Sequence, residues 1–270
     1  MDNRVKQFFC ALLCTSLLGI ANLLPAFAHA ASSIKFEVLA ERTHKPNLFT
    51  QGLLVDGDHF YESSGLYNQS LLVTYPIAEP ASTWAKISAP FTRKQTIPAR
   101  YFAEGLALLG DKLYLLTWQE QTLLIYDKTT LNYLESMSYK GEGWGLTTDG
   151  KQLIRSDGSD TLYFHNPADF AVTKMLKVTD AGVEISQLNE LEFADGFLWA
   201  NIWYDDRIIK IDPTTGHVVG EMDLAILKRN LKLDNNEQVL NGIAWDEKQK
   251  AFWITGKNWP KMFLIRIATK

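Results

Sequence analysis

Cysteine is scarce in this sequence. Its 270 residues include only two, Cys10 and Cys14, and both lie within the first thirty positions. A chain that loses this segment has no disulfide, no thiol nucleophile and no cysteine-ligated metal site. Its stability must then come from packing alone, which a chain of this length can achieve as one domain.

Residues 1–30 have the pattern of a secretory signal peptide. Two basic residues near the start precede a long apolar run, and Ala28-His29-Ala30 at its end fits the A-x-A cleavage motif. A retained membrane anchor is the alternative, because the run is almost long enough to span a bilayer, but Asn22 and Pro25 interrupt it. We therefore predict cleavage just after this motif and export to the periplasm or the extracellular space, with residues 31–270 forming the mature catalytic domain.

Strong charge is also lacking. The formal net charge is −4, and the sequence has no cluster of basic residues of the kind that binds nucleic acid. Nor does the mature sequence contain a basic amphipathic helix that would hold it on a membrane surface. We expect an exported monomer with no nucleic-acid partner and no membrane attachment after cleavage.

Several catalytic motifs are missing as well. The mature chain has no G-x-S-x-G elbow and no P-loop. Its four histidines, His44, His59, His165 and His217, lack the spacing of metal sites. We therefore expect no metal and no organic cofactor, and we interpret the histidines as ordinary surface or strand residues.

Helical periodicity is also lacking, because no long stretch of the mature chain shows it. Gly, Asp and Asn turn residues separate runs of β-branched and aromatic residues, which is an all-β pattern. A unit recurs five times, and each copy opens with a similar short motif. The openings are Phe49-Thr50-Gln51-Gly52-Leu53, Phe102-Ala103-Glu104-Gly105-Leu106, Glu142-Gly143-Trp144-Gly145-Leu146, Leu188-Asn189-Glu190-Leu191 and Leu240-Asn241-Gly242-Ile243.

These five units predict a five-bladed β-propeller. A four-stranded sheet cannot bury both of its faces alone, so the units must pack radially, and closure of the ring protects the strand edges. A β-sandwich with accidental similarity among its strands is the alternative. We expect residues 34–39 to complete the last blade, and residues 224–236 to form the one helix, between the fourth and fifth blades.

The repeated openings also predict a functional site. The innermost strand of each propeller blade lies along the central channel, so equivalent residues at its start form a ring. Here the ring contains one carboxylate, three amides and one indole, namely Glu104, Gln51, Asn189, Asn241 and Trp144. Such variety at a repeated position indicates the floor of a pocket, in which only Glu104 can transfer a proton.

Aromatic residues near Glu104 would desolvate its carboxyl group and raise its pKa. They are Phe49, Phe102, Trp118, Trp144 and Trp203. A buried carboxyl group among aromatic faces suits proton transfer for a small, partly apolar or cationic substrate. Alternatively, Glu104 is a structural acid bonded to the backbone amides of the turn at Gly105, and the spacing leaves both interpretations open.

Lys257 follows a glycine after the second strand of the fifth unit, where it is either solvated or able to polarise a carbonyl group.

Taken together, the motifs closely resemble those of the glutamine cyclotransferases of plants and bacteria, and the resemblance covers essentially all of the mature chain. Its most specific pieces include Phe102-Ala103-Glu104-Gly105-Leu106, Leu116-Thr117-Trp118, Glu142-Gly143-Trp144-Gly145-Leu146-Thr147, Ser156-Asp157-Gly158-Ser159, Ala200-Asn201-Ile202-Trp203 and Thr255-Gly256-Lys257-Asn258-Trp259-Pro260. The resemblance implies a five-bladed propeller that converts the N-terminal glutamine of peptides or proteins to pyroglutamate and releases ammonia. It implies no metal or organic cofactor.

The same resemblance implies a role for each matched residue. Glu104 would be the general acid and base. Gln51, Asn189 and Lys257 would hold the γ-amide and the first peptide carbonyl group of the substrate. The aromatic pocket around the glutaminyl chain would consist of Phe49, Phe102, Trp118, Trp144 and Trp203.

Two other functions remain possible at this point. A calcium-dependent propeller lactonase or hydrolase would use Glu104, Asn189 and Asn241 as oxygen ligands at the axis, although Trp144 in the ring speaks against it. A non-catalytic propeller would bind a peptide on its aromatic face, and Glu104 would then be merely structural.

Overall fold

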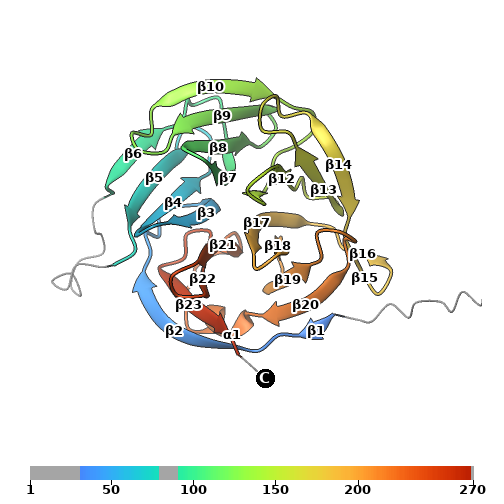
Figure 1. Cartoon of the computed structure of the whole chain (residues 1–270). Coiled ribbons are helices and arrows are strands. Elements are labelled where there is room, and N and C mark those ends of the chain that lie inside the picture. Colours follow the sequence, from blue (N-terminus) through green and yellow to red (C-terminus); the bar gives the residue numbers. More distant parts are fainter. Residues whose placement is uncertain (1–30, 79–90, 269–270) are drawn as a thin grey trace, which may run out of the picture.

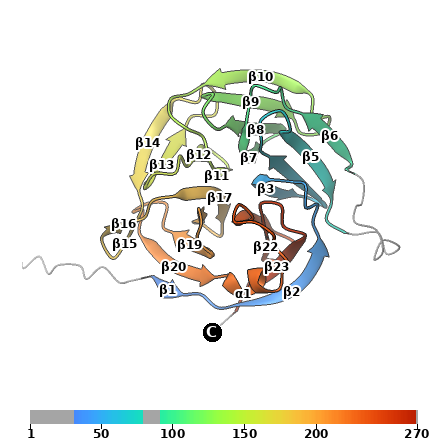
Figure 2. The same cartoon turned by 180° about the vertical axis from the view of Figure 1, so that it is seen from behind.

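The computed structural model describes residues 31–78 and 91–268, so the predicted signal peptide of residues 1–30 lies outside the described residues. Five sheets are arranged around one centre, as Figure 1 shows from one side and Figure 2 from the other. The five-bladed β-propeller that the repeats predict is confirmed.

Each blade is built around an antiparallel sheet whose strands follow one another from the centre outward. The first blade contains β3 (Thr50–Asp56), β4 (His59–Ser64), β5 (Leu71–Pro76) and β6 (Arg93–Thr96). The second contains β7 (Ala103–Leu109), β8 (Lys112–Thr117), β9 (Thr122–Asp127) and β10 (Tyr133–Ser138). The third contains β11 (Leu146–Thr148), β12 (Leu153–Arg155), β13 (Thr161–His165) and β14 (Val172–Lys177). A small hairpin of β15 (Thr179–Asp180) and β16 (Val183–Glu184) follows.

The last two blades share the N-terminal part of the described chain. The fourth contains β17 (Leu188–Ala194), β18 (Phe197–Ile202), β19 (Arg207–Ile211) and β20 (Val218–Asp223), and the fifth contains β21 (Leu240–Asp246), β22 (Ala251–Gly256) and β23 (Lys261–Ile267). The outer strand of the fifth blade is β2 (Phe36–Thr43), which pairs antiparallel with β23. The preceding β1 (Ser32–Ser33) pairs parallel with β20 of the fourth blade. The N-terminal segment therefore closes the ring as predicted, and it bridges both neighbouring blades.

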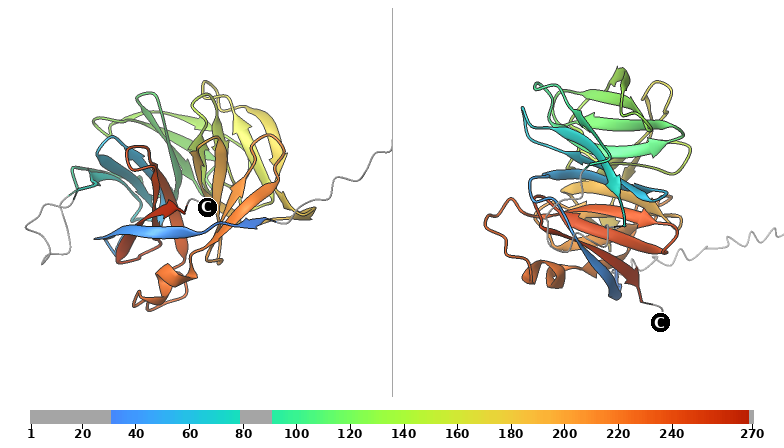
Figure 3. Two further views of the ribbon diagram at one scale, coloured as in Figure 1. Left: turned by 60° about the horizontal axis from the view of Figure 1, so that its bottom comes forward. Right: turned by 90° about the vertical axis from the view of Figure 1, so that its left-hand side faces the viewer.

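The predicted excursion between the fourth and fifth blades contains α1 (Ala225–Arg229), a shorter helix than residues 224–236 would form. It protrudes beyond the blades in both views of Figure 3. Leu227 points into the protein interior and is buried, which fixes this short turn to the blades. Within residues 31–78 and 91–268, no helix is long and apolar enough to span a bilayer.

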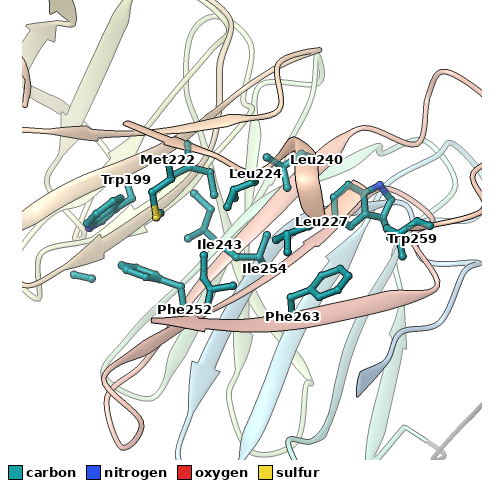
Figure 4. Packing of buried hydrophobic residues seen from close by; sticks show 14 residues of the cluster. Trp199, Met222, Leu224, Leu227, Leu240, Ile243, Phe252, Ile254, Trp259 and Phe263 are labelled. Atoms are coloured by element: carbon teal, nitrogen blue, oxygen red, sulfur yellow. The ribbon is translucent and has the colours of Figure 1, made fainter. Parts of the chain in front are cut away.

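Apolar side chains fill the space between adjacent blades. Figure 4 shows this packing between the fourth and fifth blades, where the rings of Trp199 and Phe252 lie with centroids 4.9 Å apart. Ile243 and Met222 are completely buried in the same cluster. Because each sheet buries its faces against its neighbours, the apolar core consists of five clusters, one between each pair of adjacent blades.

The glycine that follows the ring residue lets neighbouring inner strands approach closely. A Cβ atom at Gly105 would lie 2.3 Å from the nitrogen of Leu146, and one at Gly145 would lie 2.0 Å from the carbonyl oxygen of Asn189. Glu190 occupies this position in the fourth blade. Its carboxylate accepts hydrogen bonds from the backbone N–H groups of Leu53 (3.2 Å) and Ile243 (2.7 Å), so it joins three blades at the axis.

Candidate active site

β-Bulges turn the ring residues toward one end of the channel. In four blades, the pairing register between the first and second strands shifts at the ring residue, namely Gln51, Glu104, Asn189 and Asn241. A bulge leaves its residue outside the regular pairing and re-aims the side chain. In the third blade, Trp144 instead precedes the short inner strand β11. The repeated opening motif is therefore the sequence of a bulge that presents a side chain at the channel mouth.

A pocket of about 230 Å³ opens at this mouth. It is lined by Phe49, Gln51, Leu66, Phe102, Glu104, Trp118, Trp144, Asn189, Trp203, Glu237 and Lys257. The structure thus brings together the nine predicted catalytic and substrate-binding side chains, from positions more than two hundred residues apart, and of the predicted ring only Asn241 does not line the pocket.

Glu104 lies on the floor of this pocket with only 5% of its surface exposed. Its Oε1 accepts a hydrogen bond from the side-chain amide of Gln51 at 3.0 Å. Burial raises the pKa of Glu104 well above the ordinary value; the positive charge of Lys257 opposes this shift, and the negative charges of Glu142 and Glu120 add to it. The carboxyl group therefore binds its proton more tightly than the carboxyl group of an exposed glutamate does.

The structural interpretation of Glu104 required bonds to the backbone of the turn that follows it. The N–H group of Gly105 instead donates to the carbonyl oxygen of Trp144 at 2.7 Å. The carboxylate that is held by backbone amides belongs to Glu190, the neighbour of another ring residue. Glu104 is thus left facing the pocket with a side-chain partner, which favours the chemical interpretation.

The amide side chains of the ring form a short hydrogen-bonded chain. Asn241 is buried outside the pocket lining, and its Nδ2 donates to the backbone oxygen of Thr50 (2.9 Å) and to Oε1 of Gln51 (3.3 Å). These bonds orient Gln51 so that its NH₂ group faces Glu104. In contrast, Oδ1 of Asn189 is buried and has no hydrogen-bond partner among the described residues, so Asn189 retains an acceptor for a donor group of a ligand.

Lys257 extends into the pocket from the turn directly after β22. Its backbone N–H donates to the carbonyl oxygen of Val239 at 2.9 Å, and its Nζ lies 4.8 Å from the centre of the Phe49 ring. Burial lowers the pKa of Lys257, while the carboxylates of Glu104 and Glu237 oppose that shift. The ammonium group is therefore held in a poorly hydrated place, where its attraction to the carbonyl oxygen of a bound ligand would be stronger than in water.

The aromatic residues form the walls of the pocket in two groups. Phe102 contacts Phe49 and Trp118, with ring centroids 6.4 and 5.6 Å apart, and Trp144 contacts Trp203 at 5.4 Å. Two glycines leave the space for these rings. A Cβ atom at Gly65 would lie 2.3 Å from Phe102, and one at Gly158 would lie 2.7 Å from Trp144.

Sequence reasoning did not select two lining residues, Leu66 and Glu237. Glu237 lies in the segment between the fourth and fifth blades, where no repeat motif marks it, and its Oε1 accepts a hydrogen bond from Tyr204 Oη at 2.6 Å. Leu66 has a positive φ of 87° in the turn after β4. Tyr204 and Asn258 occupy the position of Leu66 in the fourth and fifth units and also have a positive φ. Because the residue type differs at each of these turns, the repeat gave no signal for Leu66.

The interpretation of the histidines as ordinary surface or strand residues is wrong for His44, which is buried and lies just beyond the end of β2, whereas His165 is a buried residue of strand β13. His44 bonds through Nε2 to the carboxylate of Glu62 (3.1 Å) and through Nδ1 to the carbonyl oxygen of Trp259 (2.8 Å). Glu62 also accepts a hydrogen bond from Thr50 (2.7 Å). This network joins the first blade to the fifth next to the pocket, and so fixes the strand ends that carry Gln51 and Lys257.

The sequence and the fold are similar to those of known proteins. Residues 11–267 match the family described as glutamine cyclotransferase. The chain belongs to this family. It is 38% identical over 237 residues to the glutaminyl-peptide cyclotransferase of Arabidopsis thaliana, covering 86% of this chain and 71% of the relative. It is also similar to the crystal structure of the Myxococcus xanthus glutaminyl cyclase, with a TM-score of 0.80 and 36% identity, over 88% of this chain and 100% of the other.

As a member of the glutamine cyclotransferases, the chain is an enzyme of the acyltransferase class and acts as a glutaminyl-peptide cyclotransferase. The resemblance that its motifs show is thereby confirmed, and the lactonase and the non-catalytic propeller find no support in these relatives. Across the described residues, no group of three or more His, Cys, Asp or Glu side chains is placed to hold a metal ion. All nine predicted site residues fall within the matched range.

Proposed function

We propose that Glu104 is the general acid and base with which this enzyme closes the N-terminal glutamine of a peptide or protein into pyroglutamate. The observation that carries the proposal is a buried carboxyl group with a raised pKa, facing an aromatic pocket that also contains one ammonium group. The aromatic walls suit the methylene groups of the glutaminyl chain and the cationic amino terminus.

The proposed reaction begins with proton transfer. The substrate's α-ammonium group gives one proton to the carboxylate of Glu104, and the resulting amine attacks the γ-amide carbon. The C–N bond to the amide nitrogen then breaks, while that nitrogen receives the proton from Glu104 and the second proton that the ring nitrogen gives up. Ammonia leaves as ammonium, the lactam keeps one N–H, and Glu104 is again a carboxylate.

Positioning supplies much of the acceleration, because the attacking and the attacked groups belong to one residue. In the proposal, Gln51 and Asn189 hold the γ-amide through their side-chain amides. Lys257 stabilises the negative charge that develops on the γ-carbonyl oxygen. The aromatic walls restrict the glutaminyl chain to the bent conformation that five-membered ring closure requires.

Turnover of glutamine-initiated peptides tests the function directly. We expect the mature protein to convert such a peptide into a product lighter by one ammonia, with matching ammonia release, at an unchanged rate in the presence of EDTA. A peptide with an acetylated N-terminal glutamine should remain intact because it lacks the attacking amine. Mass spectrometry follows both peptides. Conversion no faster than the spontaneous reaction, or conversion that EDTA abolishes, would contradict the proposal.

We also propose that residues 1–30 are removed during export. In support, the backbone N–H of Ala31 donates to Oδ1 of Asp180 at 2.9 Å, so cleavage before Ala31 would create an α-ammonium group next to a carboxylate. The propeller begins at Ser32 and would stay complete. Protein recovered from the periplasm or the medium should begin at Ala31 by N-terminal sequencing, and a chain that stays full-length inside the cell would contradict this.

A further inference from the structure

The carboxylate of Glu142 lies between the two groups of aromatic rings in the pocket wall. Phe102 contacts Trp118 on one side, and Trp144 contacts Trp203 on the other. Among the described residues, no ring contact joins Trp118 to Trp144. The two halves of the wall come from different blades, so something other than ring packing must set their spacing.

Glu142 makes that connection with a single oxygen atom. Its Oε2 accepts hydrogen bonds from Nε1 of Trp118 at 2.8 Å and from Nε1 of Trp144 at 2.9 Å. Its other oxygen accepts one from the side-chain amide of Gln119 at 3.1 Å. Partial burial raises the pKa of Glu142, but the three hydrogen bonds outweigh this and lower it overall, so the group is a carboxylate at neutral pH.

A hydrogen bond and close packing also fix the backbone at Glu142. Its carbonyl oxygen accepts a hydrogen bond from Nη1 of Arg155, a buried side chain that also bonds to His165 and lies over the ring of Tyr163. The next residue, Gly143, has no free space, because a Cβ atom there would lie 2.2 Å from the hydroxyl oxygen of Tyr139. The acceptor that meets both indoles therefore has a defined position and is not a loosely held surface group.

We propose that Glu142 is a positioning residue, which holds the indoles of Trp118 and Trp144 at the separation that the substrate's glutaminyl chain requires. The inference rests on the proposed function and adds to it a residue outside the pocket lining. Rotation of either indole out of the wall would break a hydrogen bond to a charged acceptor, which is stronger than one to a neutral group. Small displacements of groups that position a substrate can reduce rates by about 10²-fold.

The test compares Glu142→Met, which keeps a similar volume but has no oxygen acceptor, with Glu142→Gln, which retains one acceptor oxygen. We expect Glu142→Met to lower kcat/KM for a glutamine-initiated peptide about 10- to 100-fold, through both a higher KM and a lower kcat. Glu142→Gln should recover most of this loss. In ¹H–¹⁵N spectra, the indole N–H signals of Trp118 and Trp144 should shift strongly in the Met variant and weakly in the Gln variant.

Glu247→Met is the matched control. Glu247 lies in the hairpin turn of the fifth blade and accepts a hydrogen bond at 2.7 Å from the indole N–H of Trp245, which is half-buried and lies outside the pocket. This substitution should shift the signal of Trp245 and leave turnover unchanged. If the Met variant of Glu142 does not fold, Glu142→Ala provides the same comparison.

Three results would overturn the inference. One is unchanged kinetics in a folded Glu142→Met protein, and another is unchanged indole signals of Trp118 and Trp144. The third is an equal loss in the Met and Gln variants, because charge and not bond acceptance would then be responsible. A wild-type protein that does not convert the peptide would instead refute the proposed function, while the indole signals would still report whether Glu142 holds the rings.

Discussion

We expect Glu104→Gln to lower kcat/KM for a glutamine-initiated peptide about 10²- to 10⁴-fold, the range that a general acid–base group supplies. Glutamine has the same shape and can still accept the hydrogen bond from Gln51, but it cannot take up and return a proton. Steady-state kinetics measure the loss, and thermal unfolding shows that the variant remains folded. A neutral glutamine at this position also avoids the free-energy cost of burying a charge, so the variant protein should be no less stable than the wild type.

The pH profile separates this role from a structural one. Because burial raises the pKa of Glu104, kcat/KM of the wild type should increase with pH through a limb well above the ordinary range of a glutamate, as the carboxyl group loses its proton. In the variant, that limb should disappear.

Glu192→Gln is the matched control for Glu104→Gln. Glu192 lies on the same kind of inner strand, lines a different cavity, and has a pKa that burial raises to about 8. Its replacement should leave both the rate and the limb unchanged. If kcat/KM of Glu104→Gln is within about threefold of the wild-type value, Glu104 is not the general acid and base. The acid–base role requires a loss of about 10²- to 10⁴-fold.

We expect Lys257→Met to lower kcat/KM about 10²- to 10³-fold, which is the usual loss when one preorganised donor to a developing negative charge is removed. Methionine keeps the contact with Phe49 but carries no charge, so the loss measures the ammonium group. Because the positive charge of Lys257 lowers the pKa of Glu104, its removal should also move the acid limb of kcat/KM to higher pH. Kinetics over a pH series measure both effects in one experiment.

Lys210→Met provides the comparison for this second prediction. The ammonium group of Lys210 lies 3.7 Å from the centre of the Phe197 ring, and burial lowers its pKa as it does for Lys257. It belongs to β19 of the fourth blade and does not line the pocket. An acid limb that stays in place in Lys257→Met would mean that Lys257 does not act on Glu104 electrostatically, and a wild-type rate would mean that it does not act on the substrate.

The roles of two glutamates in equivalent motifs could not be distinguished from the sequence. Glu104 is the ring residue of the second unit, and Glu190 follows the ring residue of the fourth, one step further along the strand. Burial raises the pKa of both. The carboxyl group of Glu190 accepts hydrogen bonds from two backbone N–H groups of other blades. The carboxyl group of Glu104 instead accepts one from a side-chain amide and faces the open pocket. Their partners come from distant segments, so only the folded chain separates the structural acid from the chemical one.

Glu142 and His44 were missed for the same physical reason. Glu142 stands in a motif that the repeat singles out, yet nothing in its neighbours along the chain indicates that Trp118 donates to it across a blade boundary. His44 meets Glu62 from the segment that closes the ring, and their spacing in sequence has no meaning outside that closure. Hydrogen bonds between segments that meet only in the fold leave no periodic trace in the sequence.

The sequence by itself determined the number of blades, because each blade opens with a local motif repeated at an equivalent position. It also indicated the strand that closes the ring and nine of the eleven side chains that line the pocket. In four blades, the bulge at the start of the inner strand spans only one or two adjacent residues, so it is a local feature of the sequence. Tertiary structure alone decided which groups those side chains meet. Burial, hydrogen-bond partners and pKa depend on atoms from other blades, and radial packing brings these together only when all five sheets have formed.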